Sequence, residues 1–297
     1  MATEARGATL VPVLALLFNA FVWGVSWWPF RQLEGLGLHP LWATALIYTL
    51  CALALLVQRP MALAEILRTP ALWVLVAAAG TTNATFNWAV TVGDVVRVVL
   101  LFYLMPVWAL LLARVLLGER LTALALLRVA MALAGAAIVL WPTGAGAGAA
   151  DLAPPHSLAD GLALLGGFSF ALNNVMLRRE AQRSGAARAL AMFLGGAVVA
   201  GTLAAGLSAA GTAPWPPAPA WGWVLGALWM GAFFLLSNLA LQHGAARLAA
   251  GATAVVMISE VFFASASAVV LGAGVVTVSL LVGAALILGA ALLATRG

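Results

Sequence analysis

Long apolar runs, separated by short polar segments, follow one another along the whole chain. Each run is close to the roughly 20 residues that an α-helix needs to cross the hydrocarbon core of a bilayer. The runs are continuously apolar rather than alternating, which excludes a transmembrane β-barrel. We therefore predict an all-α integral membrane protein with ten transmembrane helices, near residues 11–31, 40–58, 70–92, 95–117, 122–141, 158–178, 187–208, 220–242, 249–272 and 275–295.

The composition agrees with this pattern and excludes a globule with a hydrated surface. Hydrophobic residues make up 65% of the 297 residues and charged residues only 8%, whereas a soluble domain carries about 25% charged residues. The formal net charge of +5 does not indicate a nucleic-acid partner, because the arginines lie between apolar runs and form no single patch. We expect the lipid bilayer to be the solvent for most of the surface.

Several kinds of chemistry are not expected of this sequence. Cys51 is the only cysteine, so neither an internal disulfide nor a thiolate metal cluster can form. His39, His156 and His243 are dispersed, which offers no metal site. There is no Walker A motif for ATP, and neither G-x-S-x-G nor H-E-x-x-H occurs. We expect no cofactor, no metal and no enzymatic activity.

The positions of the basic residues, all of them arginine, predict the orientation in the membrane. Segments that face the cytoplasm carry an excess of basic residues. With both termini inside, only Arg31 and Arg97 fall on the outer side. The remaining arginines fall on the inner side: Arg6, Arg59, Arg68, Arg114, Arg120, Arg128, Arg178, Arg179, Arg183, Arg188, Arg247 and Arg296.

The two halves of the chain resemble each other. Asn87–Gly93 and Asn238–Gly244 both read N-x-A-x-x-x-G, at an offset of 151 residues. Val115–Gly118 matches Val269–Gly272 at an offset of 154, and Leu133–Ala137 matches Ile287–Ala291 at the same offset. We predict a first five-helix repeat in residues 1–141, an outer, periplasmic linker in 142–157 and a second five-helix repeat in 158–297.

An odd number of spans in each half has a consequence for the architecture. The second half must enter the membrane from the opposite face, so that the halves pack as an inverted repeat. Secondary transporters are built in this way, with a substrate site near the midplane between the repeats and with alternating access to it. The sequence therefore predicts a secondary transporter of small metabolites.

Spans one and four carry motifs that resemble a known family. The motifs are Trp23-Gly24, the run Tyr103-Leu-Met-Pro106-Val-Trp-Ala and the turn Leu117-Gly-Glu119-Arg-Leu-Thr122. The start of the second half, Asp160 to Asn174, also fits. On these residues the chain resembles the ten-span EamA-type members of the drug/metabolite transporter superfamily. The resemblance implies a multi-pass protein of the bacterial inner membrane that exports small molecules.

The second half departs from the pattern of that family. Glu260 stands where the ninth helix usually has proline, and the usual Leu-Gly-Glu turn reads Leu271-Gly272-Ala273. The glutamate and the aromatic-rich spans are similar to aromatic amino-acid exporters. The resemblance therefore implies amino acids, including aromatic ones, as substrates. Other metabolites, drugs and sugars are the alternatives.

Glu260 is the first candidate for substrate binding or coupling. It lies about eleven residues into its span, with no basic residue within a helical turn. A carboxylate at that depth costs at least about 2.5 kcal/mol, so intramembrane acids usually face a cavity. Glu260 would bind a substrate ammonium or carry a proton. The alternative is a protonated glutamate that is hydrogen-bonded to a neighbouring helix.

Pro106 occupies the position in the first half that matches Glu260 in the second. A proline within a helix removes one backbone hydrogen bond and frees the carbonyl of Phe102. This could kink span four toward the cavity and provide a gating joint. An ordinary packing kink is the alternative.

The remaining candidates are polar and aromatic side chains within the spans. Amides can bind the carboxylate and amine of a zwitterion, although each one could instead bridge two helices. Trp23 could stack on an aromatic substrate, or could simply belong to the core. The candidates for substrate binding besides Glu260 are Asn83, Asn87, Tyr103, Trp23, Asn174 and Asn238.

Two other classes of membrane protein fit the sequence less well than a carrier. A membrane-embedded enzyme needs a clustered nucleophile, base or metal site, and the sequence shows none. A channel usually builds its pore from several identical chains and needs no inverted repeat. Protons are the candidate coupling ion, and passive exchange is the alternative. Ten spans can enclose a whole pathway, so a monomer or a weak dimer is adequate.

Overall fold

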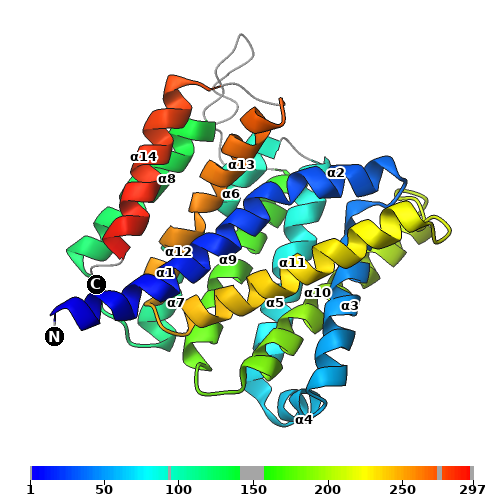
Figure 1. Ribbon diagram of the computed structural model, residues 1–297, viewed down its shortest axis with the longest axis horizontal. Helices are drawn as coiled ribbons and strands as arrows, with labels where there is room; N and C mark the ends of the chain where they lie inside the picture. The colour runs from blue at the N-terminus through cyan, green and yellow to red at the C-terminus, as the bar shows by residue number, and fades with distance from the viewer. Residues whose placement is uncertain (1, 93–94, 141–156, 273–275, 295–297) are drawn as a thin grey trace.

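The computed structural model describes residues 2–92, 95–140, 157–272 and 276–294, and these residues form fourteen α-helices (Figure 1). The first half contains α1 (Ala2–Val25), α2 (Trp27–Gly35), α3 (Pro40–Gln58), α4 (Met61–Arg68), α5 (Pro70–Val92), α6 (Val95–Phe102), α7 (Met105–Leu116) and α8 (Ala123–Leu140). The second half contains α9 (Leu158–Arg179), α10 (Gly185–Ala209), α11 (Trp221–Ala245), α12 (Ala250–Met257), α13 (Ser259–Val270) and α14 (Val278–Ala294).

Over the described residues, each of the ten predicted spans is helical, but three of them consist of two helices. The pairs are α1 with α2, α6 with α7, and α12 with α13. Six helical segments are long and apolar enough to cross a membrane, and a seventh is added if α4 and α5, which meet at 102°, count as one. Helices α7, α8 and α14 are apolar but shorter. The all-helical membrane architecture is therefore confirmed, and the number ten stays a prediction.

Helices of the two halves interleave in the bundle. Helix α5 packs on α9 and α10, α3 packs on α10, and α1 packs on α11 and α13. Helices α8 and α14 lie side by side at one edge of the bundle (Figure 1). Each of these pairs joins one helix from each half. The predicted outer linker in 142–157 lies outside the described residues except for Ser157.

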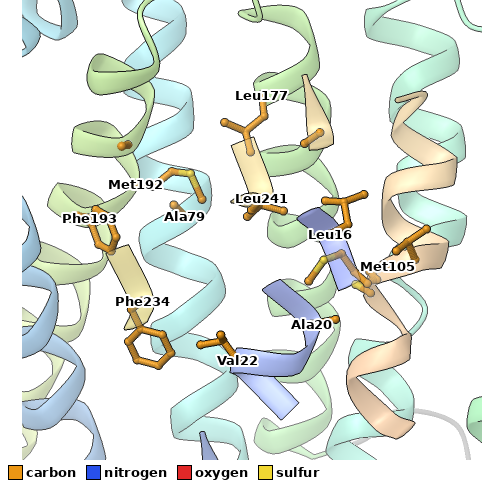
Figure 2. Close-up of a cluster of buried hydrophobic side chains, with 14 of the residues drawn as sticks. Leu16, Ala20, Val22, Ala79, Met105, Leu177, Met192, Phe193, Phe234 and Leu241 are labelled. Carbon is orange, nitrogen blue, oxygen red and sulfur yellow. The ribbon is translucent and has the colours of Figure 1, made fainter. Parts of the chain in front are cut away.

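The bundle has an apolar core and an apolar rim. Leu16, Met105, Leu177 and Leu241 are buried where helices from both halves meet (Figure 2). Large apolar side chains are also exposed on the outside, and Val57 and Val270 are each 84% exposed. An outer surface of this kind suits contact with lipid rather than with water.

Local capping fixes where several helices begin. The Nδ1 atom of His39 accepts the N–H of Leu41, and Pro40 occupies the first helical position of α3. Ser157 and Asp160 form a reciprocal capping box at the start of α9. Such caps satisfy backbone N–H groups that have no partner within the helix.

Small residues permit close approach between helices of opposite halves. A Cβ atom on Gly135 of α8 would lie 2.7 Å from the carbonyl oxygen of Gly283 of α14. A Cβ atom on Gly80 of α5 would likewise overlap the backbone of Gly195 of α10. These contacts hold the two halves together through their backbones, as is common between membrane helices.

Two of the three broken spans, α6–α7 and α12–α13, have the same construction. Each consists of an eight-residue helix followed by a twelve-residue helix. Each then ends in a Leu-Gly turn in which the glycine has positive φ, +68° at Gly118 and +72° at Gly272. Glycine adopts this conformation without the strain that a side chain would cause. The offset of 154 residues between the turns equals the offset found in the sequence.

Candidate cation-binding cavity

A cavity of about 680 Å³ lies between the two halves. Its wall is formed by side chains from α1, α2, α3, α5 and α6 of the first half and from α9 to α13 of the second. This volume falls in the range of small-molecule sites. Six of the seven residues predicted to bind or couple substrate line this one cavity: Glu260, Asn83, Asn87, Tyr103, Trp23 and Asn238.

Glu260 enters the cavity at the break of a span. Helix α12 ends at Met257, and Glu260 is the second residue of α13. The hydroxyl of Ser259 donates to the carbonyl of Val256 at 2.7 Å, beside the break. The side chain of Glu260 is partly exposed within the cavity wall. The break therefore turns the start of α13, with its carboxyl group, toward the cavity.

Glycine on α1 brings span one against this break. A Cβ atom on Gly24 would lie 2.7 Å from the Cβ atom of Phe263 and 2.8 Å from the carbonyl oxygen of Glu260. Any larger residue at position 24 would push α13 away. The neighbouring Trp23 lines the cavity beside Glu260. The motif Trp23-Gly24 thus positions the carboxyl group and an aromatic wall together.

The charges around the cavity are few. Glu260 is the single acidic residue among the described lining residues, and Arg31 is the single basic one. The guanidinium of Arg31 lies over the ring of Trp27, 5.5 Å from its centroid. Glu260 forms no ion pair with any described residue. Tyr103 lies close enough to Glu260 for the two side chains to interact electrostatically.

Two amides on α5 face the cavity and are held from α3. The hydroxyl of Tyr48 donates to Oδ1 of Asn83 at 3.2 Å, and Nδ2 of Asn83 donates to the carbonyl of Ala79. Nδ2 of Asn87 donates to Oγ1 of Thr44 at 2.9 Å. These amides therefore bridge helices and line the cavity at the same time.

A second polar group lies between α1, α10 and α11. Nδ2 of Asn19 donates to Oγ of Ser237 at 2.6 Å and to its carbonyl at 2.9 Å. The amides of Asn238 and Gln242 are hydrogen-bonded to each other at 2.7 Å. Asn19 and Asn238 line the cavity. Asn19 did not emerge from the sequence, although it is a polar residue within an apolar run and the same argument applies to it.

Two neighbouring asparagines on α9 differ in their surroundings. Asn173 lines the cavity, whereas Asn174 does not. Asn174 is completely buried, and neither of its side-chain polar atoms has a hydrogen-bond partner among the described residues. Asn174 therefore lies outside the cavity lining, and the neighbouring Asn173 of α9 contacts the cavity instead.

Aromatic side chains form two walls of the cavity. Trp23 stacks on Phe234 with ring centroids 4.7 Å apart, and Tyr48 contacts Phe193 and Phe234 edge to face. Across the cavity, Phe102 contacts Phe86, Tyr103 and Phe170. Figure 2 shows Phe193 and Phe234 beside Met192 on the same side of the cluster. An apolar surface of this size with one carboxyl group suits a ligand that carries an aromatic or aliphatic body and a cationic group.

The cavity extends toward one end of the bundle. Arg31 of α2, Pro40 at the start of α3 and Ala268 near the end of α13 all line it. At the opposite end α12 packs on α7 and on α1, while the described residues show no comparable packing of α6 on α13. Helix packing therefore closes the cavity at the α7–α12 end, and its described lining extends toward the α2–α13 end.

Pro106 takes no part in the lining. Helix α6 ends at Phe102, and Pro106 is the second residue of α7, in its first turn. The proline therefore begins a new helix instead of bending a continuous one. The backbone of Phe102 packs against Gly167 of α9, where a Cβ atom would lie 2.5 Å from the Phe102 carbonyl oxygen. Pro106 and Glu260 hold the same position in their broken spans.

Comparison with known proteins places the first half in a family. Residues 10–141 match the sequence model of the EamA-like transporter family. This segment belongs to the EamA-like transporter family. The expected relation to the drug/metabolite transporter superfamily is thereby confirmed, and the chain is a multi-pass membrane transporter of small molecules.

Two further comparisons concern the whole chain. No curated protein sequence matches it. A solved crystal structure matches it with a TM-score of 0.76 and 21% sequence identity, over 98% of this chain and 96% of the other. At this identity the match demonstrates a shared fold over both halves and nothing about the substrate.

Within the described residues, no group of three His, Cys, Asp or Glu side chains could hold a metal ion.

Proposed function

We propose that this EamA-like protein is a secondary carrier that exports amino acids, including aromatic ones, from the bacterial cytoplasm. The observation that supports this most strongly is the cavity itself, in which Glu260 has no cationic partner among described side chains. A substrate ammonium would supply the missing positive charge. Amides of Asn83, Asn87 and Asn238 would bind the carboxylate of a zwitterion, and the aromatic walls would hold its side chain.

The corresponding construction of the two broken spans supports alternating access. We infer that residues 1–141 and 158–297 are inverted repeats, with ten spans in all and both termini in the cytoplasm. Under this assignment the closed α7–α12 end faces the cytoplasm and the α2–α13 end faces the periplasm. To open the inner side, the contacts between α12 and α7 would break. Contacts between α6 and α13 would form in their place and close the outer side. Such exchange between repeats is how inverted-repeat carriers move a substrate.

Glu260 also supports a role for protons. A carboxyl group in a cavity between membrane helices can bind either a proton or a cationic substrate, but not both at once. Proton entry from the outer side would then release the substrate, and passive exchange would occur where the substrate gradient alone suffices. A monomer contains the whole cavity and is adequate for this mechanism.

Apolar cations are a second candidate substrate class. The single carboxyl group and the two aromatic walls would accommodate a hydrophobic cation without any need for the amides. Amino-acid transport requires the amides as well. Substitution of Asn83 and Asn87 by alanine therefore distinguishes the two classes, because it would weaken transport only of the zwitterion.

Uptake into liposomes that contain only the purified protein tests the proposal. Labelled amino acids are screened with and without an imposed pH gradient, and a labelled hydrophobic cation is tested in parallel. Saturable movement of aromatic amino acids is the expected result, and dependence on the gradient would support proton coupling. Absence of any amino-acid movement by correctly folded protein, with movement of the cation, would overturn the amino-acid assignment.

A further inference from the structure

A second cavity lies away from the first, at the end of the bundle where α8 begins. Its volume is about 560 Å³. It is lined by α7, by residues 119–122 of the following turn, by the first turns of α8 and by the start of α12. The proposed transport mechanism makes no use of it.

Arg128 on α8 is the unusual residue of this cavity. Its side chain lines the cavity and is only 6% exposed. Nε and Nη2 of its guanidinium have no hydrogen-bond partner in the described part of the chain. Arginine cannot lose its charge in a protein, and an unpaired buried charge is strongly destabilising. The cavity in front of Arg128 is therefore suited to an anion.

The other charged residues of the cavity are Glu119 and Arg120. Glu119 is turned toward α12, where it accepts the backbone N–H of Ala250 and lies in the field of Arg178. Burial raises the pKa of Glu119, while the positive charge of Arg178 and the N–H of Ala250 act in the opposite direction. Glu119 thus already has its partners. Arg120 and Arg128 remain to bind an anion.

The surroundings of the cavity indicate an anion that belongs to the membrane. Leu121 and Leu124 line it and are exposed on the outside of the bundle. Arg128 lies five residues after the start of α8, which is about 8 Å along the helix axis. An arginine at this depth can reach the headgroup layer with its long side chain. Basic pockets between membrane helices bind anionic headgroups in this way.

We propose that this cavity binds the phosphate of an anionic phospholipid in the leaflet where α8 begins. The guanidinium of Arg128 is the buried ligand, Arg120 contacts the phosphate from the rim, and an acyl chain runs along Leu121 and Leu124. Val282 of α14 occupies the position that matches Arg128 at the offset of 154 residues. The second half therefore has no arginine that corresponds to Arg128, so the proposed site has no symmetric counterpart in the other leaflet.

Titration of the full-length detergent-solubilised protein with phosphatidylglycerol or phosphatidylcholine, followed by native mass spectrometry, tests the site. The unaltered protein should bind one phosphatidylglycerol more tightly than any phosphatidylcholine. Arg128→Gln should weaken that binding by about tenfold or more, because a charge-assisted hydrogen-bond pair is lost. Arg128→Lys should have an intermediate effect, since it keeps the charge but not the fork of donors.

Arg114→Gln is the matched control, because Arg114 is exposed near the end of α7 and lines neither cavity. This variant should bind phosphatidylglycerol like the unaltered protein. Equal binding by Arg128→Gln, or equal binding of the two lipids, would overturn the proposal. Displacement of the lipid by inorganic phosphate or glycerol phosphate at similar concentrations would instead assign the site to a soluble anion.

A measurement on the unaltered protein covers the case in which Arg128→Gln does not fold. Phosphatidylglycerol should raise the thermal unfolding temperature more than phosphatidylcholine does, and added salt should reduce the difference. Equal stabilisation by both lipids at low salt would contradict the proposal.

Discussion

The two broken spans α6–α7 and α12–α13 share one backbone design and differ at one position of it. Both have helices of eight and twelve residues, and both end in a Leu-Gly turn. The second residue after the break is Pro106 in the first half and Glu260 in the second. Proline has no N–H and fixes φ, so it favours the start of a helix. Glutamate contributes nothing of this kind to the break, but it brings a carboxyl group into the cavity.

This difference shows how two copies of one element can take different roles, one in shaping the backbone and one in binding. Pro106 is buried and does not line the cavity, so its effect is on the backbone. Glu260 lines the cavity, whereas the hydroxyl of the neighbouring Ser259 is hydrogen-bonded to the backbone of α12. The broken span of the first half thus provides a helix break, and that of the second half provides the same break together with the carboxyl group of Glu260. The following substitutions test this division.

Glu260→Gln should have the largest effect on transport. A hydrogen bond to a charged group contributes about 1.5–3 kcal/mol, so apparent substrate affinity should fall by about tenfold or more. Uptake by liposomes with matched amounts of protein measures this effect. Glu34→Gln, at an exposed position near the end of α2, is the control and should transport normally. Normal transport by Glu260→Gln at acidic and neutral pH would exclude the proposed role.

Glu260→Pro makes the second broken span like the first. Proline is tolerated in the first turn of a helix, so the variant should insert into the membrane and unfold within a few degrees of the unaltered protein. Transport should nevertheless fall at least as far as in Glu260→Gln. A protein that fails to fold would mean that the two breaks are not equivalent in their backbones.

Trp23→Ala should alter selectivity by a smaller amount. An aromatic pair contributes about 0.5–1.5 kcal/mol beyond the burial of its surface, so affinity for phenylalanine should fall about two- to tenfold relative to leucine. Trp23→Phe keeps a ring against Phe234 and should restore most of the preference. Phe86→Ala, on the opposite wall, is the comparison. A larger loss there would place the substrate ring near Phe86 of α5 instead of near Glu260.

Pro106→Ala should have the smallest effect, and its effect should be on stability. Loss of proline at a compatible position increases the entropy of the unfolded chain and lowers stability by about 0.4–1 kcal/mol. Thermal unfolding in detergent measures this change, and apparent substrate affinity should stay unchanged. A marked loss of substrate affinity would show that Pro106 acts on the site and not only on the helix break.

The sequence was sufficient to predict the helices and the correspondence between Pro106 and Glu260. The length of the apolar runs predicts the helices, and the offset of 154 residues shared by two of the motif pairs predicts the correspondence. The break at Ile258 could not be predicted, because no proline or glycine marks it in the sequence. Long apolar runs with breaks in their middle therefore look continuous in sequence.

Membership of the cavity was predicted only in part. Asn83, Asn87 and Asn238 were found because amides are rare in apolar spans. Tyr48 and Phe193 were not found, because an aromatic residue in such a span is equally suited to the core. Asn173 and Asn174 are adjacent, so they lie on faces of α9 about 100° apart. A span that is apolar on every side has no hydrophobic periodicity, so its sequence cannot show whether Asn173 or Asn174 points into the cavity.

Counterflow in liposomes tests the central claim, a carrier with one alternating site, most directly. Liposomes that contain the purified protein are loaded with unlabelled phenylalanine and diluted into a trace of labelled phenylalanine, with no pH gradient. The account predicts a transient accumulation of label inside, because efflux of unlabelled substrate returns the site to the outside, and this accumulation should be lost in Glu260→Gln. Equilibration of the label without any transient accumulation by folded, inserted protein would contradict the account.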